Sequence, residues 1–357
     1  MHVVILAASR HPVAEPFAGG LESLTWHLVR GLRARGVQVT VFAGEGSDPG
    51  LGAELLRTHP LRLSHAARSD PSMVPETWLR EHDAYLQVML ALQSRPDIDV
   101  VHNNSLHHLP VVMARALLQP LVTTLHTPPT PWLEPAVQLA GRSPARRPGY
   151  VAVSRHTARS WSHVTPSEVV HNGVDVDRWP LGTGGAGLAW AGRIVPEKAP
   201  HLAVEMARAV GLPLRLAGPV GNLEYFESRL RPLLGGDVEY VGHLTILGLA
   251  QLFGSAAATV VTPVWDEPYG LVAAESLACG TPVVALDRGG LGEVIDEHTG
   301  VLVSPRDPVA AAPEAVGRAL ELDRLDCRRR AETACSVERM VDEYLGVYAR
   351  LAAPVAA

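Results

Sequence analysis

The sequence predicts an α/β fold made of two doubly wound parallel-sheet domains. Residues 2–8 form an unbroken apolar run, which is typical of a strand buried on both faces of a sheet. A loop, a helix and a second strand follow this run, and the same order of elements returns after residue 187. The chain of 357 residues is also long enough for two domains of about 150 residues each.

In the first half, the strand at 2–8 leads into a polar loop that ends in Gly19-Gly20. Leucines then recur at helical spacing until Gly36, and residues 37–41 alternate as a second strand. Such a strand–helix–strand unit crosses over right-handed into a parallel sheet. Further strands are expected at 100–101, 121–125 and 150–153.

The second half repeats the pattern, starting with a strand over 188–191. A helix is expected over 199–210, and Gly211 ends it before a strand that begins at residue 214. A strand ending at 261, a helix over 270–279 and a strand over 282–285 follow. The stretch 340–351 predicts a long last helix, with a frayed end over 353–357. Because Pro and Gly interrupt residues 160–185, we predict domains at 1–170 and 171–340 and a terminal helix at 341–357.

Composition argues against several classes of protein. The formal net charge of −6 gives no reason to expect nucleic acid or an anionic membrane surface as a partner. No apolar run reaches the roughly 18 residues that span a bilayer, and the start lacks the basic lead of a signal peptide. We therefore expect a cytoplasmic protein without a transmembrane segment, and peripheral membrane contact stays open. The 3 cysteines imply no disulfide framework.

One candidate site is the segment 192–198, Gly-Arg-Ile-Val-Pro-Glu-Lys, where a strand passes into a helix. Arg193 offers a planar fork of donors and Lys198 a point charge, the two usual ways to bind phosphate oxygens. A helix N-terminus adds backbone N–H groups and a positive dipole end. The alternative interpretation is a solvated loop with two exposed cations.

A second candidate is the segment Glu267-Pro268-Tyr269-Gly270-Leu271, with Glu275 following it on the expected helix. One division of roles has Glu275 accepting hydrogen bonds from ribose hydroxyls and Glu267 facing a sugar. The amides of Gly270 and Leu271 would then meet phosphate. The alternative is a pair of acids that favour the positive end of the helix dipole.

The N-terminal half supplies weaker candidates. His126 emerges at the end of the strand 121–125 and could bond a sugar hydroxyl, although an isolated histidine there is more often structural. The pair Gly19-Gly20 lets backbone approach a ligand closely, and Glu22 could bind acceptor hydroxyls or favour the helix dipole. Further polar candidates are Ser154 and Thr157, which follow the strand 150–153, and the run Asn172-Gly173-Val174-Asp175, which could equally be an ordinary turn. His102 and Ser154 are, with Glu22, the residues that could bind an acceptor.

Metal and other nucleotide motifs are absent. Gly44-Glu45-Gly46 is followed by Ser-Asp-Pro and not by an apolar helix, so it fails as a dinucleotide fingerprint. The histidines at 102, 107 and 108 lack accompanying carboxylate or thiolate spacing, which argues against zinc. There is no Walker motif and no convincing Asp-x-Asp metal holder. We therefore expect no metal and no cofactor.

Taken together, these motifs resemble the retaining glycosyltransferases of family 4, which have the GT-B fold of two Rossmann-like domains facing a cleft. The resemblance is most specific in the C-terminal half and looks closest to the actinobacterial branch of antibiotic-sugar enzymes, including the avilamycin type. Its motifs there are Gly192 to Lys198, Ala217-Gly218-Pro219, Val241-Gly242, Glu267 to Glu275, Ala278 to Ala285, Gly289-Gly290 with Glu293, and Thr299 to Val303.

The resemblance implies a hexose-type transfer from a nucleotide diphosphate, with UDP favoured, to a hydroxyl acceptor, with retention of configuration and without a metal. It implies that Arg193 and Lys198 neutralise the diphosphate, that Gly270 and Leu271 cap it, and that Glu275 binds the ribose. It also implies donor contacts from Gly20, Val241 and Tyr269, sugar contacts from Glu267 and His126, and acceptor contacts near Glu22. The last helix would cross back onto the N-terminal domain. Two departures are Tyr269, where the family commonly has Phe, and Ala199, where Gly is frequent.

Three alternatives share the fold. A sugar-nucleotide epimerase is one. A phosphorylase is another, but it would need a pyridoxal-binding lysine, and no lysine here is placed for that role. A non-catalytic sugar-nucleotide-binding partner would be expected to lack His126, Glu267 or Lys198, and all three are present.

Overall fold

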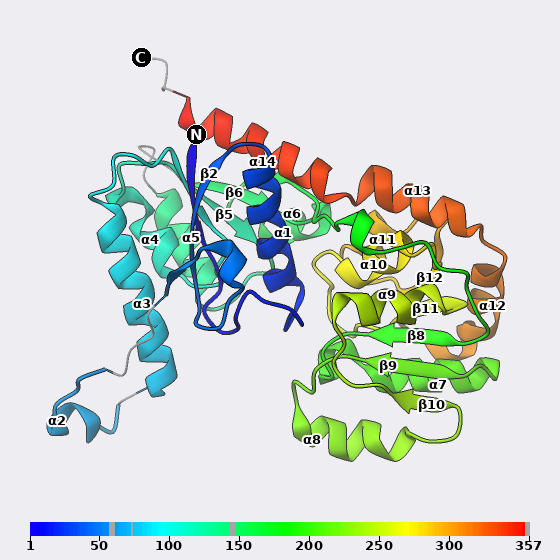
Figure 1. Cartoon of the computed structure of the whole chain (residues 1–357). Helices are drawn as coiled ribbons and strands as arrows, with labels where there is room; N and C mark the ends of the chain where they lie inside the picture. The colour runs from blue at the N-terminus through cyan, green and yellow to red at the C-terminus, as the bar shows by residue number, and fades with distance from the viewer. Residues whose placement is uncertain (57–60, 73, 143–147, 354–357) are drawn as a thin grey trace.

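A computed structural model describes residues 1–56, 61–72, 74–142 and 148–353. Two parallel sheets, each flanked by helices, lie side by side (Figure 1). Within the described ranges, the N-terminal sheet has seven strands in the order β3-β2-β1-β4-β5-β6-β7. These strands are β1 (His2–Leu6), β2 (Gln38–Ala43), β3 (Glu54–Leu55), β4 (Val100–Asn103), β5 (Leu121–Leu125), β6 (Gly149–Ala152) and β7 (Glu168–Val169).

The C-terminal sheet has, over the same described ranges, six strands in the order β10-β9-β8-β11-β12-β13. They are β8 (Leu188–Ala191), β9 (Leu214–Ala217), β10 (Val238–Tyr240), β11 (Ala258–Val261), β12 (Val283–Leu286) and β13 (Gly300–Val303). In both sheets the strand order reverses beside the first strand, at β1/β4 and at β8/β11. Ligands of doubly wound sheets bind at the carboxyl ends of the strands beside such a reversal.

Helices cover both faces of each sheet. The larger ones are α1 (Gly20–Ala34), α3 (Glu76–Leu92), α5 (Leu133–Gly141), α7 (Pro200–Val210), α9 (Ile246–Gly254), α10 (Leu271–Ala278), α12 (Pro308–Leu320), α13 (Arg324–Ala334) and α14 (Val337–Ala352). The shorter ones are α2 (His65–Arg68), α4 (Leu109–Met113), α6 (Arg155–Trp161), α8 (Leu223–Tyr225) and α11 (Leu291–Val294).

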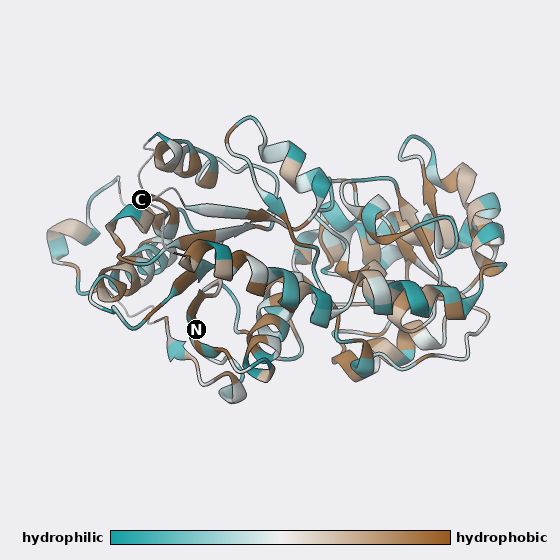
Figure 2. Cartoon of the chain, turned by 90° about the horizontal axis from the view of Figure 1, so that it is seen from above, coloured by the Kyte–Doolittle hydropathy of each residue, from teal (hydrophilic) through white to brown (hydrophobic). Residues whose placement is uncertain are grey.

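The cores follow the alternation of side chains along each strand. In β1, Val3 and Ile5 join the cluster formed with α1 and α14, whereas Val4 and Leu6 join the cluster formed with α3. The same division in the C-terminal sheet places α7 and α12 on one face and α9, α10 and α13 on the other. Figure 2 shows the apolar colour gathered on the strands and on the helix faces turned toward them. No helix in the described part of the chain combines the length and apolar character needed to cross a membrane.

The chain passes between the two sheets at two points that lie beside each other. Val174, between β7 and β8, pairs with the segment between α13 and α14: its amide donates to the Cys335 carbonyl at 2.7 Å, and its carbonyl accepts from Val337 at 3.0 Å. From there α14 runs across the N-terminal sheet and packs on α1 (Figure 1). A Cβ at Gly31 of α1 would lie 2.5 Å from Val341, so glycine permits this close packing.

Most expected elements occur, with shifts at their ends. The helix expected from residue 199 begins one residue later, because Ala199 adopts a left-handed conformation with φ of +46°. The last helix begins at Val337 and not at 340, since the Ser336 side chain caps it by accepting from the Arg339 amide. The frayed end expected at 353–357 lies outside the described residues beyond 353.

Candidate active site

A cavity of about 270 Å³ lies between the two sheets, at the carboxyl ends of their central strands. Segments that follow β1 and β5 line it on the N-terminal side, and segments that follow β8, β9 and β11 line it on the C-terminal side. The predicted site residues that line it are Gly20, His126, Arg193, Lys198, Glu267, Tyr269, Gly270, Leu271 and Glu275. The fold thus brings together candidates that are up to 255 positions apart in the sequence.

Two helix N-termini meet across this cavity. α1 begins at Gly20 and α10 at Leu271, and a Cβ built on Gly20 would lie 2.9 Å from the Leu271 side chain. Neither helix has a side-chain cap, and within the described chain the amides of the first two residues of each helix have no hydrogen-bond acceptor. Such amides and the positive ends of two helix dipoles favour an anion.

Lys198 supplies a full positive charge to the same place. Its Nζ lies 2.5 Å from Glu267 Oε2 and 5.3 Å from the centre of the Trp265 ring. Trp265 Nε1 donates to the same carboxylate oxygen at 3.0 Å, and Glu267 Oε1 has no partner among the described residues. The ammonium therefore keeps donors for a ligand, while Oε1 can accept from a hydroxyl.

The composition of the chain gives Lys198 further weight. It is the single lysine of the sequence, and all other members of the set of 31 Lys and Arg are arginine. A point-charge ammonium and a planar guanidinium differ in size and hydrogen-bond geometry. The only lysine side chain of the sequence thus lines the cavity. That Lys198 is the only lysine can be read from the sequence alone.

The loop that carries Lys198 is held by a buried hydrogen-bond chain. Trp190 Nε1 donates to Thr262 Oγ1 at 3.1 Å, and the Thr262 hydroxyl lies 3.2 Å and 3.1 Å from the carbonyls of Lys198 and Ala199. A left-handed conformation at a residue other than glycine costs about 1–2 kcal/mol. Glycine at position 199 would adopt this conformation without that cost.

Arg193 and Glu275 complete the C-terminal wall. The Arg193 guanidinium is half-exposed in the cavity and lies 3.8 Å from Glu197. The Glu275 carboxylate has no hydrogen-bond partner in the described part of the protein, and burial raises its pKa from 4.5 to about 8. A ligand that donates hydrogen bonds to this carboxylate would favour its ionised form and lower this pKa.

His126 faces the cavity from the end of β5. Its Nε2 lies 2.9 Å from Asn104 Oδ1, and since an amide oxygen only accepts, this nitrogen carries the proton. Burial lowers the pKa of His126 to about 3. The imidazole is thus uncharged at neutral pH and offers Nδ1 as an acceptor.

Two acceptor-side predictions are wrong. His102 does not line the cavity: it is fully buried in β4, where Nδ1 bonds the Tyr348 hydroxyl at 2.6 Å and Nε2 bonds Thr124 at 2.7 Å. Ser154 is also fully buried, and its hydroxyl caps α6 by accepting from the Thr157 amide at 3.0 Å. Both side chains are buried and hydrogen-bonded within the N-terminal domain, so neither is available to an acceptor.

Three other predictions need adjustment. Val241 packs partly buried against the core, and His243 and Leu244 line the cavity in its place, because the loop after β10 turns there. Glu22 is 6% exposed, does not line the cavity, and has its pKa raised by burial. Tyr269 contributes its ring to the wall, but burial and its contact with Cys335 place the hydroxyl away from the cavity.

Sequence reasoning missed several lining residues. Thr262 and Trp265 follow β11 directly, so their position at a strand end was a usable signal. Asn172, for which the sequence left a polar candidate and an ordinary turn open, lines the cavity, and its Oδ1 has no partner among the described residues. His243 Nε2 donates to the Phe17 carbonyl at 3.1 Å and so joins the two sides of the cavity, a contact that no local pattern indicates.

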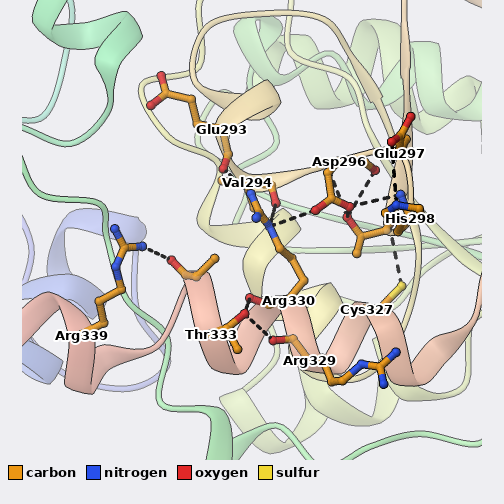
Figure 3. A network of polar contacts seen from close by, with 12 residues as sticks. Glu293, Val294, Asp296, Glu297, His298, Cys327, Arg329, Arg330, Thr333 and Arg339 are labelled. Carbon is orange, nitrogen blue, oxygen red and sulfur yellow. Dashed lines mark hydrogen bonds and ion pairs between the residues drawn. The ribbon is translucent and has the colours of Figure 1, made fainter.

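Glu293 fixes the two sheets relative to each other. Its carboxylate, from α11, accepts from the amides of Arg155 and His156 at the start of α6, at 2.8 and 2.9 Å, and from His171 Nε2 at 2.9 Å. Burial opposes its ionisation, but these hydrogen bonds outweigh burial and lower its pKa. Figure 3 shows how Arg330 of α13 holds this segment by donating to the carbonyls of Glu293 and Val294, at 2.9 and 3.1 Å.

Among the described residues, no group of three or more His, Cys, Asp or Glu side chains could hold a metal ion. The cysteines at 279, 327 and 335 are free and buried.

Comparisons with known proteins agree with this architecture. The family model "Glycosyltransferase Family 4" matches residues 18–178, and "Glycosyl transferases group 1" matches residues 180–334. A glycogen synthase of Mycobacterium tuberculosis is 30% identical over 395 aligned positions, which cover 94% of this chain and 89% of the relative.

Solved structures show the same fold at low identity. AviGT4, a glycosyltransferase involved in avilamycin A biosynthesis, superposes with a TM-score of 0.72 at 23% identity, covering 99% of this chain and 98% of that one. HepE of Anabaena, solved with UDP and glucose, superposes with a TM-score of 0.74 at 16% identity, covering 98% and 100%. The chain therefore belongs to the GT-B glycosyltransferases that join a family 4 domain to a group 1 domain.

Proposed function

We propose that this glycosyltransferase moves a hexose-type sugar from UDP to a hydroxyl acceptor, with retention of configuration and without a metal ion. The convergence of two uncapped helix N-termini with Lys198 and Arg193 on one cavity carries this proposal. These groups supply positive potential where a nucleotide diphosphate would develop charge on leaving, the task that a divalent metal performs elsewhere. The HepE structure with UDP and glucose supports UDP as the first donor to test.

Each charged group then has a proposed role. Lys198 and Arg193 bind the diphosphate together with the amides of α1 and α10. Glu275 accepts hydrogen bonds from the ribose, and Oε1 of Glu267 accepts from a hydroxyl of the transferred sugar. His126 meets that sugar from the opposite side. Retention and the hexose-type donor rest on the resemblance to family 4 and not on any distance.

A thermal-shift screen with UDP, GDP, ADP and dTDP, each with and without EDTA, tests the donor proposal. A ligand that binds only the folded protein raises the melting temperature, and the stabilisation grows with the logarithm of 1 + [ligand]/Kd. We expect UDP to stabilise most and EDTA to change nothing. Stabilisation by another nucleotide alone would replace UDP, loss of stabilisation in EDTA would overturn metal independence, and no stabilisation by any would refute a diphosphate site.

The pKa of Glu275 predicts proton release on donor binding. Ribose hydroxyls favour the carboxylate, so binding should lower a pKa that is about 8 in the free site. Affinity for UDP should therefore rise as pH increases from 7 to 8 and level off above 8. Calorimetry in two buffers of different ionisation enthalpy should show release of up to one proton at pH 7. Glu275→Gln should abolish both effects, and a wild type that releases no proton would contradict the ribose role.

A further inference from the structure

A group of rings lies together in the N-terminal domain, outside the lining of the cavity. It comes from α3, from the loop after β4 and from the residue before α5, and we call it the ring platform: Trp78, His82, His107, His108 and Trp132. Distances between neighbouring ring centres range from 4.5 Å for His107–His108 to 6.0 Å for His108–Trp132. The end of α3 that carries Trp78 extends beyond the N-terminal sheet (Figure 1).

Core packing does not explain this group. Trp132 is 59% exposed, and Trp78, His82 and His108 are half-buried, so their faces and edges meet solvent. Only His107 is buried, stacked on Tyr85 at 4.7 Å. Contiguous apolar surface that meets solvent and is rimmed by polar groups is a feature of binding sites.

The edges of the platform carry imidazole nitrogens that are free to form hydrogen bonds. His107 Nδ1 accepts from the Leu109 amide, so Nε2 carries the proton, and this N–H has no acceptor among the described residues. The ring nitrogens of His82 and His108 likewise have no hydrogen-bond partner in the described chain. Burial lowers the pKa of His107 to about 3 and also lowers that of His108, so both rings are neutral at pH 7.

The ring platform and the proposed transfer site are connected by a short stretch of chain. Asn104 bonds His126, which lines the cavity, and His107 follows three residues later. Three residues span at most about 11 Å, so His107 lies within that distance of the residue that positions His126. An acceptor of several sugar units is long enough to lie on the platform, span this distance and reach the proposed sugar position.

We propose that the ring platform is the acceptor subsite and that it binds a neutral oligosaccharide, with a sugar ring stacked on Trp132 and Trp78. This deepens the proposed function and rests on it. A pyranose has an apolar C–H face for an aromatic ring and hydroxyls around its edge for the imidazole nitrogens. A flat aromatic acceptor would use only the ring faces and leave these nitrogens unpaired. An anionic acceptor would meet uncharged imidazoles at His107 and His108.

Binding without transfer tests the proposal most directly. Maltotetraose, cellotetraose and mannotetraose are titrated into the full chain by saturation-transfer NMR, with wild type, Trp132→Ala and Trp78→Ala. Leu139→Ala is the matched control, since Leu139 is 52% exposed on α5 and lies outside the platform. We expect at least one tetrasaccharide to bind, each tryptophan variant to weaken it tenfold or more, and the control to bind as wild type.

The outcomes separate this proposal from the donor proposal. Failure of all three tetrasaccharides, or equal affinity in the tryptophan variants and wild type, overturns the platform. Binding of 4-nitrophenol in their place would also overturn it, in favour of an aromatic acceptor. The UDP thermal shift is measured on the same samples: a normal shift with no sugar binding refutes only the platform, whereas sugar binding with no shift refutes only the nucleotide donor.

Discussion

Replacing Lys198 with alanine is expected to lower kcat/KM for the sugar donor by at least about 100-fold. The substitution removes a positive charge from the proposed diphosphate site and leaves the Glu267 carboxylate, which lies 2.5 Å from the ammonium, with the Trp265 hydrogen bond but without its ion-pair partner. A carboxylate without a countercharge would also repel the diphosphate. Lys198→Arg should restore little, because the ammonium sits between a carboxylate and the Trp265 ring, where a planar guanidinium has a different shape.

The presence of a single lysine allows a test without mutation. Reductive methylation can modify only Lys198 and the N-terminal amine, and mass spectrometry of peptides separates the two. We expect modification of Lys198 to parallel loss of activity and UDP to protect it.

Arg215→Ala, which removes a cation whose hydrogen bond to Ser255 is exposed, is the control for Lys198→Ala and should keep full activity. Full donor affinity in Lys198→Ala would remove this residue from the diphosphate site.

The C-terminal side of the site was predictable because its residues lie in short segments at strand ends. Glu267, Gly270 and Glu275 all belong to one strand–loop–helix unit, and the spacing along the chain determines their spacing in space. The φ of +107° at Gly270 is a local requirement that glycine meets directly. Local sequence therefore carries most of the information about this wall of the cavity.

The acceptor side was less predictable because its contacts are distant in sequence. His102 is buried by hydrogen bonding to Tyr348, which lies 246 positions later on α14, and no pattern around residue 102 indicates this. Ser154 is different, since a serine three residues before Thr157 at a strand–helix junction is a readable helix cap. The ring platform likewise depends on three segments that only the fold brings together.

The second large effect is expected at His126. His126→Ala should lower kcat by about 100-fold and leave the affinity for UDP within about twofold of wild type, because the imidazole is proposed to meet the sugar and not the nucleotide. Since its pKa is about 3, its charge does not change between pH 5 and 9. The pH profile of kcat in wild type should therefore show no step attributable to this histidine.

A substitution of Asn104 tests whether His126 acts by its own contact with the sugar or also needs the hydrogen bond that positions its ring. The hydrogen bond to His126 is the one partner of the Asn104 side chain in the described chain, so Asn104→Ala frees the imidazole without removing it. A smaller loss of kcat, about tenfold, is expected there. His298→Ala, whose side chain is 74% exposed in the C-terminal domain, should retain full activity. Normal turnover in His126→Ala would exclude contact with the transferred sugar, whereas equal losses of kcat and UDP affinity would place His126 at the nucleotide.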